Sequence, residues 1–220
     1  MKTVGGATII LSLVVCSHAQ AGVSETTLFA VQTGWYNSNG LRSFGNYLVG
    51  DGVGSNYHNF SVFDLSSITL PIQSATLMLF NGSAPPNPGD GYTSPDPFET
   101  YALFDVSTDI GLLTSSGGPG VYDDLAVGTF FGSVDVTPAD NGTFVEVYLN
   151  ADSIAALNSA TGLFAFGGAI TTISHPVNVD ESVFGFSNDS SDVRLVVTIP
   201  EPMTLVLLGT FGLGAGRRRR

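Results

Sequence analysis

The side chains after residue 21 that could act as acids, bases or nucleophiles are two histidines, many carboxylates and scattered hydroxyls. A serine hydrolase needs a nucleophile, a base and an orienting acid, but the sequence holds no Gly-x-Ser-x-Gly segment. His58 and His175 lack the His-x-His or His-x₃-His spacing that would indicate a metal site. We therefore interpret both histidines as surface or turn residues and expect no enzymatic activity.

The nineteen carboxylates offer two other kinds of chemistry. Glycoside hydrolysis requires only two carboxylates at a suitable separation, so a secreted polysaccharide hydrolase stays an alternative. Calcium binding requires carboxylate and carbonyl oxygens, and Asp51, Asp123 and Asp124 lie in segments expected to be loops. No EF-hand pattern is present, and Ca²⁺ is the one cofactor that these residues could bind.

Aromatic side chains suggest a third kind of site. Trp35 and Tyr36 lie in the segment Gly34-Trp-Tyr-Asn-Ser-Asn-Gly40, which is expected to be a loop. Aromatic rings beside asparagine could form a platform on which sugar rings stack. The alternative is that Trp35 folds back onto the core.

The charge of the chain excludes one class of partner. Residues 22–201 contain all nineteen acidic residues and two basic ones, Arg42 and Arg194, so their net charge is −17. The whole-chain charge of −12 is less negative because Lys2 and four terminal arginines lie outside this segment. Nucleic-acid binding requires a cationic face, so nucleic acid is excluded as a partner. An acidic surface suits solubility outside the cell or attraction to cations.

Short apolar segments separated by turn signals indicate one all-β domain over residues 22–199. The expected strands are 27–32, 46–49, 60–65, 73–80, 98–106, 129–137, 143–149, 162–170, 183–187 and 193–199. Residues 81–97 are expected to be a long loop and residues 115–120 a flexible turn. A helix is predicted over 150–160, capped by Asn150 or Asp152. The pattern predicts an antiparallel β-sandwich, jelly-roll-like, with this one short helix covering an edge.

The first 21 residues have the layout of a cleaved signal peptide. Lys2 gives a basic start, residues 7–15 are apolar, and Ala19-Gln20-Ala21 offers small residues at the positions that a signal peptidase reads. Cleavage is expected after Ala21, with cleavage after Ala19 as the alternative. Cys16, the single cysteine, would leave with this segment, so no disulfide is expected in the exported protein.

The last 21 residues, 200–220, have the layout of a second targeting signal. Pro200-Glu201-Pro202 precedes an apolar run over 203–216, which is followed by the arginines Arg217, Arg218, Arg219 and Arg220. As a helix, this run would reach about 21 Å, which is shorter than the roughly 30 Å hydrocarbon core of a bilayer. The arginine cluster would remain on the cytoplasmic side and stop translocation. A short, glycine-containing span with a basic stop fits a segment that is held briefly in the membrane and then cut.

This order of motif, apolar helix and arginine cluster resembles the PEP-CTERM sorting signal of Gram-negative bacteria. The resemblance implies that an exosortase-like membrane protease recognises Pro200, Glu201 and Pro202 and removes the tail. The segments Gly-Trp-Tyr-Asn at 34–37 and Leu-Phe-Asp-Val-Ser-Thr at 103–108 also resemble secreted sandwich domains of such proteins, to which no activity is assigned.

Three functional hypotheses follow for a chain with a signal peptide (1–21), a sandwich domain (22–199) and a sorting signal (200–220). The first is an exported, non-catalytic protein of the cell surface or extracellular matrix, with a structural or adhesive role. The second is a module that binds carbohydrate, here the exopolysaccharide. The third is the polysaccharide hydrolase. In each case the chain would be anchored transiently in the inner membrane before release to the surface.

Overall fold

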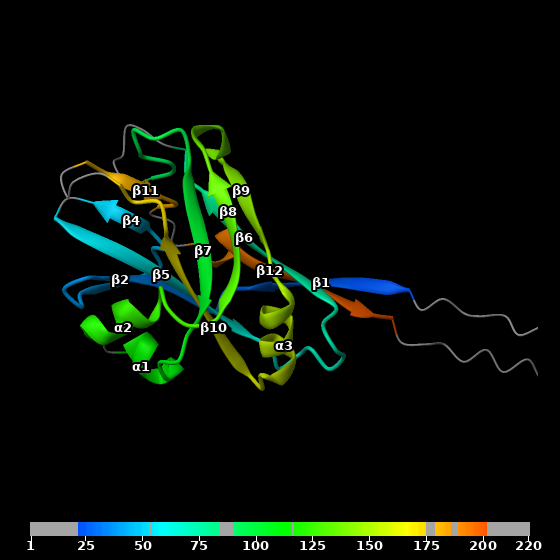
Figure 1. Cartoon of the computed structure of the whole chain (residues 1–220). Coiled ribbons are helices and arrows are strands. Elements are labelled where there is room, and N and C mark those ends of the chain that lie inside the picture. The colour runs from blue at the N-terminus through cyan, green and yellow to red at the C-terminus, as the bar shows by residue number, and fades with distance from the viewer. Residues whose placement is uncertain are drawn as a thin grey trace, which may run out of the picture.

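The computed structural model describes residues 22–52, 54–83, 90–115, 117–174, 179–185 and 189–201. Within them the chain forms two antiparallel β-sheets that pack face to face as an all-β sandwich (Figure 1). The predicted signal peptide and residues 202–220 of the predicted sorting signal lie outside the described residues. Among the residues that are described, no helix is long and apolar enough to cross a bilayer.

The smaller sheet has four strands in the order β1 (Val23–Phe29), β12 (Val193–Pro200), β6 (Ser74–Asn81) and β9 (Thr143–Tyr148). Side chains of these strands alternate between the two faces, as a half-buried strand requires. In β6, for example, Ala75, Leu77 and Leu79 are buried, whereas Thr76 and Met78 between them are partly exposed. The predicted alternation in 73–80, 143–149 and 193–199 is therefore confirmed.

The larger sheet has eight strands. Its main path runs β11 (Glu181–Val183), β4 (Val49–Gly52), β5 (Ser55–Asp64), β10 (Leu163–Ile170), β7 (Glu99–Asp105) and β8 (Phe130–Val136). Strand β2 (Gln32–Asn37) also pairs with β5, and β3 (Arg42–Phe44) pairs with β2. The main core lies between the two sheets and contains fully buried rings such as Phe63 and Phe166, whose centroids are 6.0 Å apart.

In the part of the chain that the structure describes, three α-helices pack on this sandwich. Helix α3 (Ala151–Ser159) is the predicted one, and Asn150 caps it by accepting a hydrogen bond from the Ser153 backbone at 3.0 Å. Helices α1 (Ile110–Ser115) and α2 (Pro119–Asp124) lie on the outer face of the larger sheet (Figure 1). Short 3₁₀ turns occur at Pro138–Asp140 and Ser190–Asp192.

The turn predicted over residues 115–120 is only partly confirmed, because α1 ends at Ser115 and α2 begins at Pro119, which leaves Gly117 and Gly118 as the described residues between the two helices. The reason is a second, smaller core on the outer face of the sheet, where Leu113, Val121 and Leu125 are buried against Tyr36 and Phe60. Helices of six residues cannot be recognised by periodicity. Their stability comes from this burial.

The predicted first strand, 27–32, is two strands that belong to different sheets. At the boundary, the Ala30 backbone donates to Val193 of the smaller sheet at 3.0 Å, and the next amide, Val31, donates to Val62 of the larger sheet at 2.8 Å. Strand β2 then continues through most of the predicted 34–40 loop, and the turn is confined to the residues after Asn37. There Gly40 adopts a φ of 79°, a left-handed conformation that glycine tolerates.

Candidate functional site

Three carboxylates converge at the end of the sandwich where β11 and β7 begin. Asp96, Glu99 and Glu181 each place one oxygen within 4.8 Å of the others. Glu99 and Glu181 are fully buried and Asp96 is partly buried. Buried carboxylates are rare in proteins unless they are paired or bind a cation, so this cluster is the strongest candidate for a functional site.

Backbone pairing holds the loop of Asp96 against the strand of Glu181. Thr93 and Ser182 exchange backbone hydrogen bonds of 2.8 and 2.7 Å, which attach the loop to β11. The Tyr92 hydroxyl then donates to the backbone oxygen of Asp96 at 2.6 Å. Glu99 follows shortly after as the first residue of β7. Three chain segments that are distant in sequence thus meet with fixed geometry.

Hydroxyl groups and one backbone amide surround the carboxylates. Ser94 Oγ donates to Glu99 Oε1 at 2.6 Å, and Thr172 Oγ1 donates to the other oxygen of Glu99. The Ser174 backbone amide donates to Glu181 Oε2 at 3.0 Å, and Ser174 Oγ lies 3.3 Å from Asp96 Oδ2. These donors fix the carboxylate planes while adding no positive charge.

Asp51 is a fourth carboxylate, next to one member of this cluster. It lies directly opposite Glu181 in the β4–β11 ladder, so both side chains share one face. That face is the inner one, because Val49 and Val183, two residues along each strand, belong to the main core. Asp51 is only 2% exposed, and its Oδ1 has no hydrogen-bond partner among the described residues.

The surroundings of Asp51 oppose its negative charge. Burial raises the pKa of this carboxyl above its ordinary value, and the charges of Glu181 and Asp180 raise it further, with partial compensation from a backbone hydrogen bond at Gly52. Burying an unpaired polar oxygen beside other carboxylates costs free energy. A cation in the cluster would remove that cost, and oxygen ligands of this kind suit a hard ion such as Ca²⁺.

The predicted calcium residues do not come together. Asp51 belongs to β4 and not to a loop, and its side chain faces inward. Asp123 and Asp124 belong to α2 on the outer face, where Asp124 accepts hydrogen bonds from Ser107 Oγ at 2.5 Å and the Thr108 amide at 2.7 Å. Asp123 is exposed. The structure therefore separates these three residues and gathers Asp51 with residues that the sequence analysis did not single out.

The predicted aromatic platform is only partly accessible. Tyr36 is fully buried in the outer core, and its hydroxyl donates to the Leu113 backbone oxygen at 2.6 Å. A ring in that position cannot stack on a sugar at the surface, so the placement of Tyr36 in a platform was wrong. Trp35 is partly buried and packs edge-on against Tyr57, with centroids 4.9 Å apart.

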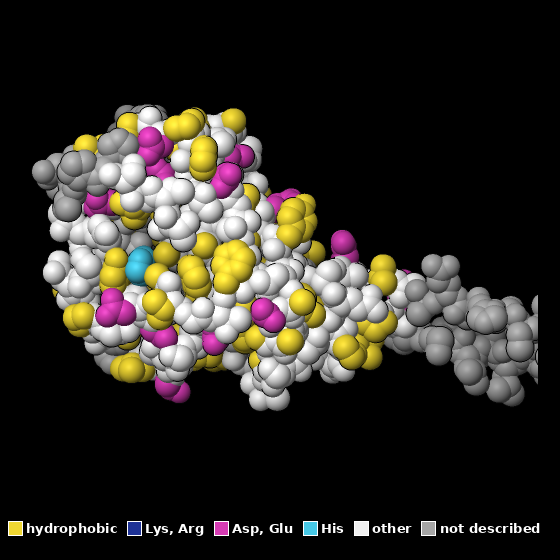
Figure 2. Space-filling view, in the orientation of Figure 1, with side chains coloured by type: hydrophobic (Ala, Val, Ile, Leu, Met, Phe, Trp, Pro, Cys, Tyr) yellow, Lys and Arg dark blue, Asp and Glu magenta, His cyan; other side chains and the backbone are white. Residues whose placement is uncertain are grey.

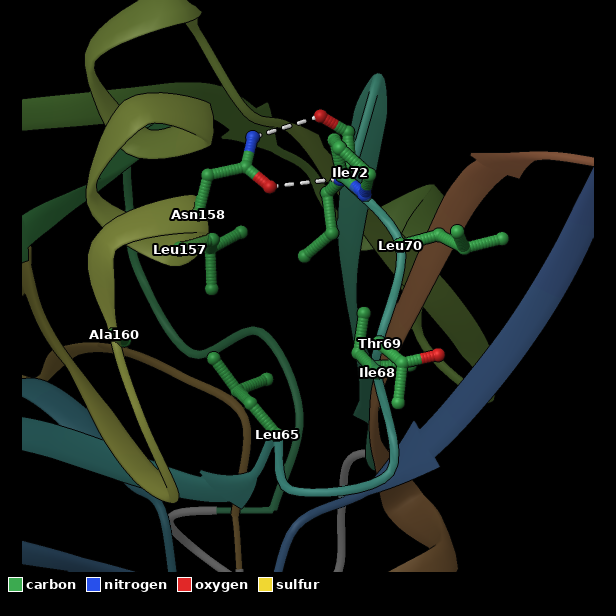
Figure 3. Close-up of a pocket in the computed structure, with 9 residues that line it drawn as sticks. Leu65, Ile68, Thr69, Leu70, Ile72, Leu157, Asn158 and Ala160 are labelled. Atoms are coloured by element: carbon green, nitrogen blue, oxygen red, sulfur yellow. Dashed lines mark hydrogen bonds between the residues drawn. The ribbon is translucent and has the colours of Figure 1, made fainter.

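A cavity of about 400 Å³ lies apart from the carboxylates, between the loop after β5 and α3 (Figure 3). Its walls come from residues 65–72 and the last turn of α3, and the labelled side chains Leu65, Ile68 and Leu157 are apolar. The Asn158 amide beside them is engaged with the backbone of Ile72, donating at 2.9 Å and accepting at 2.7 Å. Because this amide is already bonded to the chain, the cavity offers little to orient a polar ligand.

No model of a protein family matches this chain, and the search of curated proteins found no match either. The carboxylate cluster therefore stands on its own geometry. No sequence signal marks it, because its members come from β7, β11 and the loop before β7, with no fixed spacing. The sequence does contain one weak indication of the cluster, namely a carboxylate at the start or end of a strand whose other inward residues are apolar.

Proposed function

We propose that this chain is an exported, non-catalytic β-sandwich, which an exosortase-like system sorts to the cell surface or the extracellular matrix. The observation that carries this proposal is the pairing of the two ends of the domain. Val23, at the start of β1, lies opposite Pro200, at the end of β12. The Glu201 amide, in the predicted sorting motif, donates to the Gly22 backbone oxygen at 2.8 Å.

The paired ends support sorting because both processing sites would lie at one point of the molecule. β1 and β12 extend together from the body, so the first residues of β1 and the last residues of β12 lie at the same end of the molecule (Figure 1). A domain anchored by an uncleaved signal peptide, a sorting helix or both would then face the same membrane through the same end. Its opposite end would face away from that membrane.

The order of the strands supports the jelly-roll form of the sandwich. Eight strands, β1, β5, β6, β7, β8, β9, β10 and β12 in chain order, can be compared with the eight strands of a jelly roll. The smaller sheet has the order β1, β12, β6 and β9, which are the first, eighth, third and sixth of these strands. The larger sheet contains β5, β10, β7 and β8 in that order, which are the second, seventh, fourth and fifth. This alternation between sheets is what two interlocked Greek keys produce. The short strands β2, β3, β4 and β11 extend the larger sheet.

A structural role fits the carboxylate cluster better than catalysis does. Glu99 and Glu181 are fully buried and Asp51 nearly so, so a polysaccharide could not reach them without local opening. The carbohydrate-binding alternative loses Tyr36 from its platform and is left with Trp35. We therefore place the function in the exported sandwich itself and propose no reaction.

Intact mass and cellular location of the protein in its own host test this proposal. The full chain should be exported and lose both ends, whereas the combined change Pro200→Ala, Glu201→Ala and Pro202→Ala should leave the tail attached in the inner membrane. Glu25→Ala is the matched control, because Glu25 is an exposed acidic residue on the neighbouring strand β1. Normal removal of the tail from the triple variant, or a wild-type chain that keeps its tail, would overturn the proposal.

A further inference from the structure

We propose that the end of the sandwich opposite the paired chain ends binds one Ca²⁺ ion through Asp96, Glu99 and Glu181, with Asp51 as the fourth carboxylate of the site. This inference goes beyond sorting and does not depend on it. The site would tie the loop 90–97, β7 and β11 together through a single ion. The ion would be structural, because the site is enclosed.

The ligand geometry suits Ca²⁺ as it stands. The three carboxylate oxygens lie within 4.8 Å of one another, and oxygens across a Ca²⁺ ion are up to about 5 Å apart, since each Ca–O distance is about 2.3–2.6 Å. Ca²⁺ accepts six to eight oxygens in flexible arrangements, and the hydroxyls of Ser94, Thr172 and Ser174 lie next to the carboxylates. Mg²⁺ usually keeps several waters, which a cluster buried to this degree accommodates poorly.

Asp51 is an independent indication that a cation belongs here. Its side chain is 98% removed from solvent and points to the face of Glu181, yet its Oδ1 has no partner among the described residues. The neighbouring groups that act on its charge most strongly are Glu181 and Asp180, both negative. A sandwich that only needed to fill this space could use an apolar residue, as it does at Val49 two positions earlier.

The cations in the described part of the chain are engaged elsewhere. The Arg42 guanidinium lies over the Phe44 ring at 4.1 Å and donates to the Thr114 oxygen. The Arg194 guanidinium lies over the Phe144 ring at 4.2 Å and donates to the Ser191 oxygen. In Figure 2, Asp and Glu side chains are scattered over the face in view, and no Lys or Arg appears on it.

Thermal unfolding and calorimetry of the full chain can test the site. After treatment with EDTA, addition of 1 mM CaCl₂ in a buffer with about 100 mM NaCl should raise Tm by several degrees and give a one-to-one binding isotherm. MgCl₂ at the same concentration should give a much smaller shift. The sodium chloride keeps general screening of the acidic surface constant between samples.

Two amide variants separate a specific site from general screening. Glu181→Gln has the shape of the native side chain but one charge fewer, so it should fold and weaken Ca²⁺ binding at least tenfold. Glu146→Gln makes the same change at an exposed position of β9, and it should bind like the wild type. A folded wild type that binds no Ca²⁺, or equal Ca²⁺ responses in both variants, would overturn the proposal.

A second readout does not depend on stability. Tb³⁺ replaces Ca²⁺ in oxygen sites and emits when a nearby aromatic ring transfers energy to it. Tyr92 contacts one of the ligand residues directly, because its hydroxyl donates to the Asp96 backbone oxygen at 2.6 Å. Tyrosine-excited Tb³⁺ emission should therefore be strong in the wild type, be displaced by Ca²⁺ and fall in Glu181→Gln. Emission that Glu181→Gln leaves unchanged would place the ion elsewhere.

Discussion

The imidazole of His58 lies flat on the ring of Tyr122, with the centroids 3.9 Å apart and the planes 5° from parallel. The ring nitrogen Nδ1 also lies 2.7 Å from the Tyr122 backbone oxygen, to which it donates. His58 belongs to β5 and Tyr122 to α2, so one residue fastens the helix to the outer face of the larger sheet. His58 is thus a partly buried strand residue, so the sequence interpretation of it as a surface or turn residue is only partly confirmed.

The first prediction concerns the pH dependence of stability. Burial lowers the pKa of His58, and this outweighs the opposing effects of the hydrogen bond to Tyr122 and the charge of Asp123. The unfolded chain, with a histidine pKa of about 6.5, therefore binds more protons than the folded chain below that pH. The free energy of unfolding should be constant above this pH for this group and should fall as the pH drops below it.

The variant His58→Phe keeps the stacked ring but cannot titrate. Urea unfolding at pH 7.5 and 5.5 should show a smaller loss of stability for His58→Phe than for the wild type over this interval. At pH 7.5 the variant should be less stable by about 1 kcal/mol, because the hydrogen bond to Tyr122 is lost. Equal losses between the two pH values would contradict the assignment.

The second prediction concerns Asp51 without calcium. In EDTA at pH 7, Asp51→Asn should increase the free energy of unfolding by about 1 kcal/mol, since it removes a buried oxygen that has no described partner and one of several like charges. In CaCl₂ the order should reverse, because the variant loses part of the gain from the ion. Chemical denaturation under both conditions measures the two differences. A variant that is less stable than the wild type in EDTA would argue against repulsion in the cluster.

The third prediction concerns two linked, buried hydrogen bonds at the larger sheet. The Tyr101 hydroxyl donates to Asn59 Oδ1 at 2.9 Å, and Asn59 Nδ2 donates to the Tyr47 oxygen at 2.8 Å. Tyr101→Phe should reduce the free energy of unfolding by about 1–3 kcal/mol, because Asn59 Oδ1 stays buried without its donor. Tyr148→Phe is the control, since Tyr148 is 71% exposed. It should change stability by less than about 0.5 kcal/mol.

The hydrogen bond between Tyr101 and Asn59 also explains why position 168 is occupied by glycine. A Cβ atom at Gly168 would collide with the Tyr101 hydroxyl and with Asn59 Oδ1. Gly168→Ala should therefore displace both groups and destabilise the protein more than Tyr101→Phe does. Near-UV circular dichroism of the folded variant would report the displaced tyrosine. A stable Gly168→Ala protein with an unchanged spectrum would contradict this packing.

The fourth prediction concerns the attachment of α3. Both atoms of the Asn158 amide bond to the Ile72 backbone, so the helix holds the loop that leads into β6 (Figure 3). Asn158→Ala should cost about 1–3 kcal/mol, because an amide and a carbonyl lose their partners. Ser159→Ala is the matched control, as Ser159 is exposed and bonds only within its own helix. Hydrogen exchange at Ile72 should rise in the first variant and stay unchanged in the second.

The sequence could predict the parts of the fold that depend on local pattern. Alternation identified β6, β9 and β12, and the Asn150 cap identified α3. It could not predict where a strand changes sheets, as the chain does at Ala30 and Val31, because both partners are remote in sequence. It also could not show the short helices over the outer face, whose stability comes from tertiary burial.

The candidate site was beyond local reasoning for the same physical reason. Asp51 was selected for its place in a glycine-rich stretch, and it lies opposite Glu181 of the cluster, but as an inward strand residue. Glu99 begins β7 and Glu181 begins β11, and these two strands are far apart in the sequence. Only the pairing of β4 with β11 and of residues 90–97 with β11 brings the carboxylates together.

The pairing of β1 with β12 also determines how the domain would respond to mechanical load. The register joins Val23 to Pro200 at one end of the ladder and Phe29 to Arg194 at the other. A force that pulls the two chain ends apart would therefore open this ladder one hydrogen bond at a time, like a zipper. A domain held by only one of its ends would carry no force across these bonds. Cleavage of the chain at either end of the domain would therefore remove the load that opens the β1–β12 ladder most easily.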